Sequence, residues 1–261
     1  MSPQRRSIAF VGLLALGPAL ACASAAQQRA EDMHQVTREL ATTLVAHHAY
    51  DTAIPLLRQA IAHEPRSASL RRSLGVVLRD RGLYAQARDE LMLALRLGPQ
   101  DPETLSALGM LQDLTGDSLS AERWHRQALA RDTDRAEFCN NLGFSLYLQG
   151  GRDDEAVRLF EDALHRDPAA TRVYNNLGFA LARQGKYDLA LHAFQQAGSH
   201  ADALTNLGLA YALAGVRSEA QRCYLDALRL NRSQAVARQN LEALDADFAP
   251  PKAAPAPATQ G

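Results

Sequence analysis

The hydrophobic positions of this 261-residue chain recur with a period close to 34 residues. A leucine within an apolar stripe marks each recurrence, at Leu40, Leu74, Leu108, Leu142, Leu177, Leu207 and Leu241. Their successive separations are 34, 34, 34, 35, 30 and 34 residues, and glycine follows five of them. Within a stripe the apolar residues lie three or four positions apart, which is the spacing of one face of an α-helix. A fixed period of this length is typical of repeat proteins.

Each period also contains two alanines seven residues apart, which indicate a second helix. The pairs are Ala53 and Ala60, Ala87 and Ala94, Ala121 and Ala128, Ala156 and Ala163, Ala190 and Ala197, and Ala220 and Ala227. Small residues among larger apolar ones let two helix backbones approach closely. Glycines at positions 82, 116, 150, 185 and 215 separate the two helices, because glycine readily adopts the left-handed conformation that ends a helix. One helix pair cannot bury its own apolar face, so we expect the pairs to stack.

The spacing and the residue types together resemble the tetratricopeptide repeat (TPR) in six consecutive copies. The predicted fold is all-α, an α-solenoid forming a right-handed superhelix of six helix-turn-helix repeats plus a C-terminal capping helix. The repeats are expected at about 34–67, 68–101, 102–135, 136–170, 171–200 and 201–234, with the cap at 235–248. The cap is expected to turn Arg238, Glu242, Asp245 and Asp247 toward water.

Three copies depart from the common pattern. Repeat five is four residues short near Gly198, which predicts a truncated second helix and a local change in superhelical pitch. Repeat four has one extra residue at Gly150-Gly151, which predicts a longer turn. The first copy has Leu40-Ala41 instead of Leu-Gly and His48 in place of the turn glycine, and terminal repeats are often atypical.

Residues 1–26 have the three zones of a secretory signal. Arg5 and Arg6 precede an apolar run from Ile8 to Leu20, which is shorter than the roughly 20 residues that a membrane-spanning helix needs. Two cleavage sites remain open: an ordinary small-x-small site near Ala26, or cleavage before Cys22 in a sequence similar to a bacterial lipobox. We therefore expect an exported, periplasmic protein, either without an anchor or held at the outer membrane by a lipid on Cys22.

At the other end, residues 249–261 combine four prolines with alanines and offer little to bury. Such a composition is typical of a disordered or extended tail.

The charge balance and the scattered cysteines and histidines exclude several functions. The 28 Lys and Arg residues against 29 Asp and Glu residues leave a net charge of -1, so no basic field is available to bind nucleic acid. Cys139 and Cys223 are expected to be core thiols too far apart for a disulfide. The eight histidines lack metal-site spacing and are expected at solvated helix positions, and the acidic run after Arg152 is expected to be a solvated helix start. No catalytic residue, metal or cofactor is predicted.

The residues beside the Leu-Gly row are the candidate binding surface, because in a superhelix they line the inner groove. The candidates are Asn140, Asn141, Phe144, Asn175, Asn176, Phe179, Asn206 and Leu209. An asparagine amide can both donate to and accept from a peptide backbone, and the phenylalanines offer apolar area for an anchor. This pattern resembles the asparagine ladder that some TPR grooves use on extended chains. The alternative is that these asparagines only cap or solvate the first helix of each pair, while the phenylalanines pack into the next repeat. Tyr147, Tyr174 and Tyr211 fit either surface.

Within the TPR superfamily, the chain is similar to the TPR lipoprotein of tight-adherence (Flp) pilus assembly. The similarity lies in the signal ending at a Cys, the repeated Asn-Asn-Leu-Gly-Phe segments and the short Ala-Gly joint before another Asn-Leu-Gly. It implies a non-catalytic scaffold that binds protein partners, here pilus or secretin components, at the envelope of a Gram-negative bacterium. Two alternatives stay open: a factor resembling the pilotin of type IV pili, and a periplasmic adaptor for cell-wall enzymes.

Overall fold

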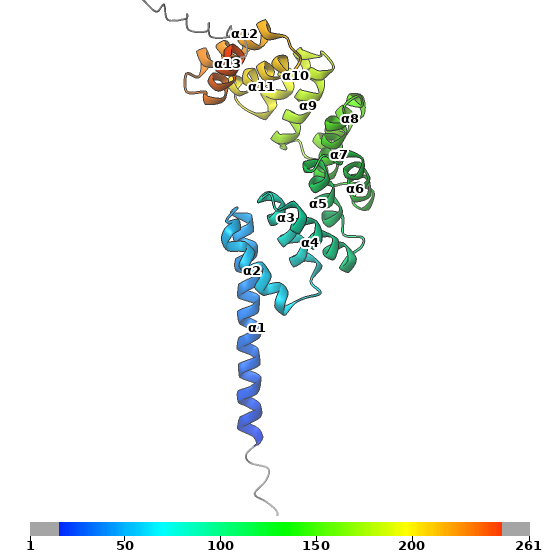
Figure 1. Cartoon of the computed structure of the whole chain (residues 1–261), viewed down its shortest axis with the longest axis vertical. Helices are drawn as coiled ribbons and strands as arrows, with labels where there is room; N and C mark the ends of the chain where they lie inside the picture. The colour runs from blue at the N-terminus through cyan, green and yellow to red at the C-terminus, as the bar shows by residue number, and fades with distance from the viewer. Residues whose placement is uncertain (1–15, 247–261) are drawn as a thin grey trace, which may run out of the picture. The chain divides into compact units, whose positions relative to one another are not determined.

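The computed structural model describes residues 16–246 (Figure 1). Over that range it consists of thirteen α-helices joined by turns. Side chains are described from residue 27 to 244, except at position 30. The chain divides into two compact units, residues 1–100 and 101–261. Each unit is treated by itself below.

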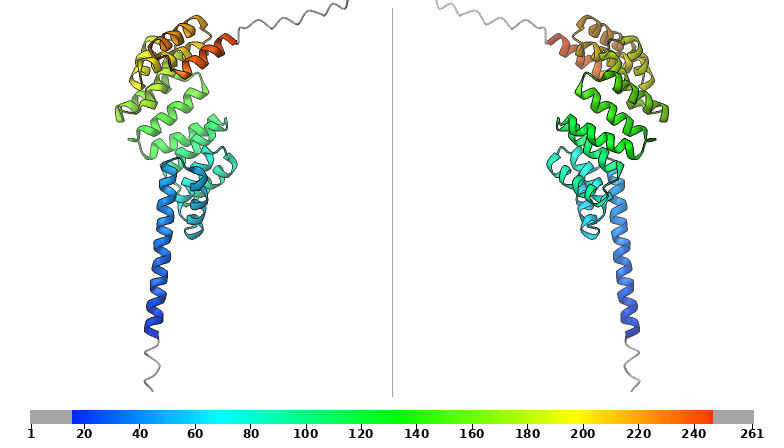
Figure 2. Two further views of the ribbon diagram at one scale, coloured as in Figure 1. Left: turned by 90° about the vertical axis from the view of Figure 1, so that its left-hand side faces the viewer. Right: turned by 90° about the vertical axis from the view of Figure 1, so that its right-hand side faces the viewer.

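The first unit contains two helix pairs. Its helices are α1 (Leu16–Ala46), α2 (Tyr50–His63), α3 (Ala68–Asp80) and α4 (Tyr84–Leu97). Helix α1 packs on α2, α3 packs on α4, and α2 joins the pairs by packing on α3. Figure 2 shows that α1 is much longer than its partners.

The second unit contains four helix pairs and a final single helix. The pairs are α5 (Pro102–Leu114) with α6 (Ser118–Arg131), α7 (Ala136–Gln149) with α8 (Asp153–Arg166), α9 (Thr171–Arg183) with α10 (Tyr187–Ala197), and α11 (His200–Leu213) with α12 (Arg217–Leu230). The final helix is α13 (Ala235–Ala246). The first helices of successive pairs also touch, from α5 through α7, α9 and α11 to α13. This consecutive packing confirms the predicted all-α solenoid of helix pairs. We call the first helix of each pair, together with α13, an A helix, and the second a B helix.

Small residues of the A helices lie under large side chains of the B helices. A Cβ added to Gly143 would lie 2.9 Å from Cε1 of Phe160, and one added to Gly208 would lie 2.6 Å from Cε1 of Tyr224. Gly178 lies in the same way under Phe194. Glycine follows the recurring leucine because the B-helix ring occupies the space that a side chain at this position would fill.

The turns between paired helices adopt the predicted left-handed conformation. Gly82, Gly116, Gly150, Gly185 and Gly215 all have φ between 75° and 82°. His48 replaces this glycine in the first pair and still has a φ of 56°. The first pair thus keeps the turn geometry of the other pairs with a side chain in place of glycine, which is uncommon at positive φ.

The two length irregularities have different outcomes. Helix α10 has 11 residues where the other B helices have 14, so the predicted truncation is confirmed. The next helix starts at once behind a capping box made by Ser199 and Asp202. The prediction of a longer turn in repeat four is wrong, because the extra residue lengthens α7 to 14 residues and two left-handed glycines then fill a turn of ordinary length.

The ends of the array differ from its interior. Leu40, expected in the core row, is 48% exposed. At the other end, Arg238 and Glu242 of α13 are exposed as expected of a polar cap, while Ala237 packs under it. The side chains of Asp245 and Asp247, most of the signal segment and the tail at 249–261 lie outside the described residues. None of the described helices is both long and apolar enough to cross a membrane.

Candidate peptide-binding site

Asparagine side chains bond the A helices of neighbouring repeats to one another. Asn141 of α7 donates to Oγ of Ser106 in α5 (3.0 Å), and Asn140 donates to Oδ1 of Asn141 (3.2 Å). Asn176 of α9 donates back to Oδ1 of Asn140 (2.8 Å). These residues precede the buried leucine of their helix and so point along the seam between two A helices.

The same arrangement continues between the next two A helices. Asn206 of α11 donates to Oδ1 of Asn175 in α9 (2.9 Å). Asn140 and Asn141 are buried, whereas Asn175, Asn176 and Asn206 are half-buried. The structure thus brings together all five predicted asparagines as a ladder within the protein. Their contacts with one another could not be read from the sequence, because they depend on the stacking register.

The predicted apolar residues are exposed to different extents. Phe144 is 38% exposed, and its ring stacks beside that of Tyr147 with 6.4 Å between centroids and 26° between the ring planes. Phe179 is half-buried and packs edge-on against Phe194 at 4.9 Å, and Leu209 is half-buried. Phe144 therefore offers its ring to a partner, and Phe179 offers only part of its ring.

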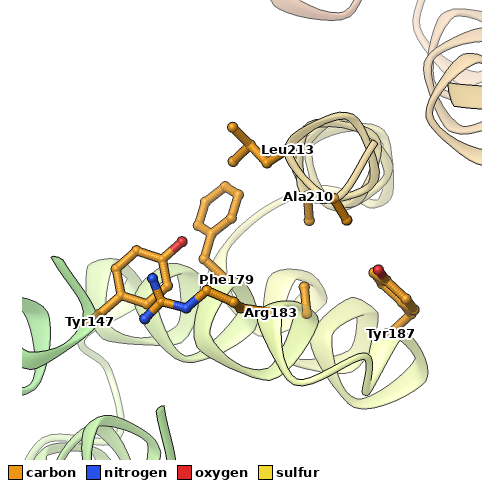
Figure 3. Close-up of a pocket in the computed structure, with 8 residues that line it drawn as sticks. Tyr147, Phe179, Arg183, Tyr187, Ala210 and Leu213 are labelled. Atoms are coloured by element: carbon orange, nitrogen blue, oxygen red, sulfur yellow. The ribbon is translucent and has the colours of Figure 1, made fainter. Parts of the chain in front are cut away.

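A pocket of about 200 Å³ opens at the C-terminal ends of α7, α9 and α11 (Figure 3). Its walls are Tyr147, Phe179, Tyr187 and Leu213, and its small residues are Ala182, Ala210 and Ala214, with Arg183 alongside. Leu213 is 71% exposed. Of these residues, only Phe179 was among the predicted site residues. Tyr147, Ala182, Arg183 and Leu213 lie three or four positions after the Phe144, Phe179 or Leu209 of their own helix, one helical turn further along, whereas Tyr187 comes from the start of α10.

Contacts within the protein fix two of the pocket's aromatic rings. The guanidinium of Arg183 lies 3.7 Å from the centroid of the Tyr147 ring, and Nε of Arg183 donates to Oδ1 of Asp153 (2.7 Å). Tyr187 stacks on Tyr211 with 4.1 Å between centroids. The pocket is thus preorganised.

The acidic run at the start of α8 belongs to an ion-pair network and is not a merely solvated helix start. Arg152 and Arg126 each bond both Glu122 of α6 and Glu155 of α8. Burial acts to raise the pKa of Glu122, but hydrogen bonds from Arg152 and Arg126 outweigh it and hold that pKa below its ordinary value. The same two arginines lower the pKa of Glu155. The network joins the third helix pair to the fourth.

One histidine is buried, contrary to the expectation that all are solvated. His125 of α6 is 1% exposed and occupies the space above Gly109 that apolar or aromatic side chains fill in other repeats. Its Nε2 lies 3.0 Å from Oδ2 of Asp113, whose Oδ1 accepts a hydrogen bond from Ser145 (2.8 Å). The carboxylate lies between serine and histidine, so the histidine cannot act as a base toward the buried Ser145.

The remaining chemistry of the described side chains is sparse. Among them, no group of three or more His, Cys, Asp or Glu is placed to hold a metal ion. Cys139 and Cys223 are buried and unbridged, as predicted. Burial raises the pKa of the Cys223 thiol to about 11, so this cysteine is a poor nucleophile.

A solenoid of stacked helix pairs with an apolar pocket on its A-helix face defines a protein-interaction scaffold. Two stretches of the chain, residues 38–102 and 141–203, match the model of the tetratricopeptide repeat family. A TPR repeat-containing protein of Pseudomonas aeruginosa is 40% identical over 88 residues, which is 33% of this chain and only 15% of that protein.

Two solved structures show the same fold at low sequence identity. PilF of Pseudomonas aeruginosa superimposes with a TM-score of 0.63 at 20% identity, covering 82% of this chain and 98% of PilF. YrrB, described as a TPR protein with an unusual peptide-binding site, has a TM-score of 0.52 at 19% identity, covering 71% of this chain and 97% of YrrB.

Proposed function

We propose that this TPR scaffold binds an extended peptide segment of a partner along the A-helix face of α7, α9 and α11, and thereby assists assembly of a tight-adherence pilus or its secretin in the bacterial envelope. The observation that carries the proposal is the row of exposed and half-buried apolar side chains, Phe144, Phe179 and Leu213, that runs beside the asparagine ladder.

The ladder suits an extended chain because its amides retain hydrogen-bonding capacity. A side-chain amide can donate two hydrogen bonds and accept two, so one bond between helices does not exhaust it. Asn175, Asn176 and Asn206 are half-buried and can still be reached from solvent. Asn140 and Asn141 are too deeply buried for direct contact, and we assign them to holding the ladder in place.

The apolar side chains supply the anchoring energy. Binding energy at an interface concentrates in a few aromatic or large apolar contacts that exclude water. Phe144 lies one helical turn before Tyr147 on α7, and Tyr147 lines the pocket. One extended peptide can therefore reach both Phe144 and the pocket. The location in the envelope and the pilus partner are supported by the signal-like N-terminus and by the sequence resemblance to the Flp assembly lipoprotein.

The test replaces one exposed ring and follows pilus assembly. A strain lacking the gene would be complemented with the wild-type chain, with Phe144→Ser, or with the control Leu119→Ser. Leu119 lies on α6, is 72% exposed and is outside the candidate site. We expect Phe144→Ser to reduce surface pili and assembled secretin multimers at least ten-fold with unchanged protein level, and Leu119→Ser to complement fully.

Two outcomes would refute parts of the proposal. If pili are unaffected by deletion of the gene, the pilus assignment is wrong. If deletion abolishes pili but Phe144→Ser complements fully, the assignment stands and the proposed binding face is wrong.

A further inference from the structure

The chain itself contains a segment whose composition suits the pocket at α7, α9 and α11. We propose that the Pro/Ala-rich segment 249–261 docks into this pocket intramolecularly. The docking itself does not depend on the proposed function. Its consequence, competition with a partner peptide, does depend on it.

The lining of the pocket suits proline. Tyr147, Phe179 and Tyr187 contribute three aromatic rings and Leu213 an aliphatic side chain, and Ala210 is one of the small residues among them (Figure 3). Proline-rich segments bind aromatic-lined grooves because their polyproline II conformation is preformed and loses little entropy on binding. The segment has Pro250, Pro251, Pro255 and Pro257 within 13 residues.

The pocket needs little rearrangement to receive such a segment. Tyr187 is already stacked on Tyr211, and Tyr147 already lies against Arg183, which Asp153 holds. Ordering flexible side chains at an interface costs roughly 0.5–1.5 kcal/mol each. Rings that are fixed beforehand avoid most of that cost, so even a short segment can bind.

The tail leaves the repeats at the end where the pocket opens. Helix α12 reverses the direction of α11, and α13 reverses it again, so α11 and α13 run parallel. Leu213 and Ala214 of the pocket lie at the C-terminal end of α11, and the chain continues toward the tail from the C-terminal end of α13. The exit of the tail and the pocket are therefore at the same ends of neighbouring A helices.

The tail is also long enough. Neighbouring packed helices lie about 8–10 Å apart, so the pocket between α9 and α11 is roughly two helix spacings from α13. Thirteen residues in polyproline II conformation extend about 40 Å, at ~3.1 Å per residue. A tethered ligand has an effective concentration in the millimolar range, so a weak contact suffices to occupy the pocket and a tighter partner can displace it.

Disulfide trapping in the full chain tests the docking. In a Cys22→Ser background, Leu213→Cys and Ala256→Cys would be combined and oxidised with glutathione disulfide, which accepts the two electrons released as the thiols join. The buried Cys139 and Cys223 do not compete. We expect the intramolecular disulfide to form at least ten-fold faster than in the control pair Leu189→Cys with Ala256→Cys. Leu189 lies on α10, is 57% exposed and does not line the pocket.

The prolines provide the second comparison. Replacing all four tail prolines by serine should reduce the trapping rate to that of the control pair, while the circular dichroism of the helices stays unchanged. Equal rates for the two cysteine pairs, trapping that is insensitive to the prolines, or disulfide-linked dimers in dilute solution would each overturn the proposal. Because the experiment includes no partner and no pilus, its failure is distinct from failure of the proposed function.

Discussion

At the scale of single residues, the helix pairs share one packing contact, between an A-helix glycine and a B-helix side chain, and differ in the side chain that makes it. The glycine after the recurring leucine of an A helix makes room for a B-helix side chain. In four of the pairs this side chain is Leu91, Phe160, Phe194 or Tyr224. The exception is His125, which forms a buried polar contact with Asp113. Replacing a buried polar group leaves its partner without a hydrogen bond, and that penalty decides the effect of the substitution.

His125→Phe restores the apolar pattern and should nevertheless destabilise the protein. Asp113 would keep only Ser145 as a hydrogen-bond partner, and an incompletely paired buried carboxylate costs about 1–3 kcal/mol or more. A second variant that adds Asp113→Leu and Ser145→Ala should recover most of the loss, because all three members of the buried polar cluster are then removed. Chemical denaturation of the two variants measures this. A single variant as stable as the wild type would contradict the explanation.

The thiol of Cys223 should make the protein less stable at alkaline pH. Its pKa is about 11 in the folded protein, whereas an unfolded thiol titrates near ~8.5. Between these values the unfolded chain has lost the proton and the folded chain has not, so raising the pH favours unfolding. The contribution is fully present below pH ~8.5 and lost as the pH rises through 11.

The measurement compares the pH dependence of unfolding between pH 8 and 11 for the wild type and Cys223→Ala. The slope should be smaller in the variant. In the native wild type, iodoacetamide at pH 8 should label Cys223 on the order of 100-fold more slowly than in denaturant, since the thiolate is the reactive form. Equal labelling rates would show that the thiol is not buried.

At the scale of helices and turns, the turn glycines are required by the backbone and not by packing. A Cβ added to Gly82, Gly116, Gly185 or Gly215 meets no atom within 4 Å, yet each has a positive φ. His48 shows that a side chain fits this space. Its ring accepts or donates a hydrogen bond with the Tyr50 hydroxyl at 2.6 Å, which ties the unusual turn to the start of α2.

Gly82→Ala should lower stability by about 1–2 kcal/mol, because the left-handed conformation is unfavourable for alanine and no new contact compensates. Gly82→Asn should lower it less, since asparagine tolerates that conformation better. Thermal unfolding followed by circular dichroism checks both variants. If alanine and asparagine were equally destabilising, the cost would not come from the sign of φ.

At the scale of the whole molecule, the N-terminus and the repeats have separate tasks in the proposed function. The repeats present the binding face, and the first residues direct the chain to the envelope. Helix α1 begins at Leu16 and continues without a break to Ala46, so it joins the signal-like segment directly to the first repeat. The predicted lipid attachment at Cys22 can therefore be tested without disturbing the packed helix pairs.

The wild-type protein expressed in its host should incorporate labelled palmitate and sediment with outer membranes, and Cys22→Ser should do neither while remaining helical. Fractionation with periplasmic and cytoplasmic markers measures this. An unlabelled wild-type protein in the periplasm would support cleavage near Ala26 instead. Recovery of the wild type in the cytoplasm would refute export.

The sequence by itself determined the repeat, the order of the helix pairs, the left-handed turns and the short α10, because each follows from residue types at fixed spacing along the chain. It also predicted that Phe144 and the asparagines form one binding surface. Only the tertiary structure decided how these side chains pack: Asn140 and Asn141 are buried in a ladder, His125 pairs with Asp113, Leu40 is exposed, and Tyr147, Tyr187 and Leu213 line a pocket. These features depend on which side chains of neighbouring repeats meet, and that register arises from stacking, which no single repeat's sequence specifies.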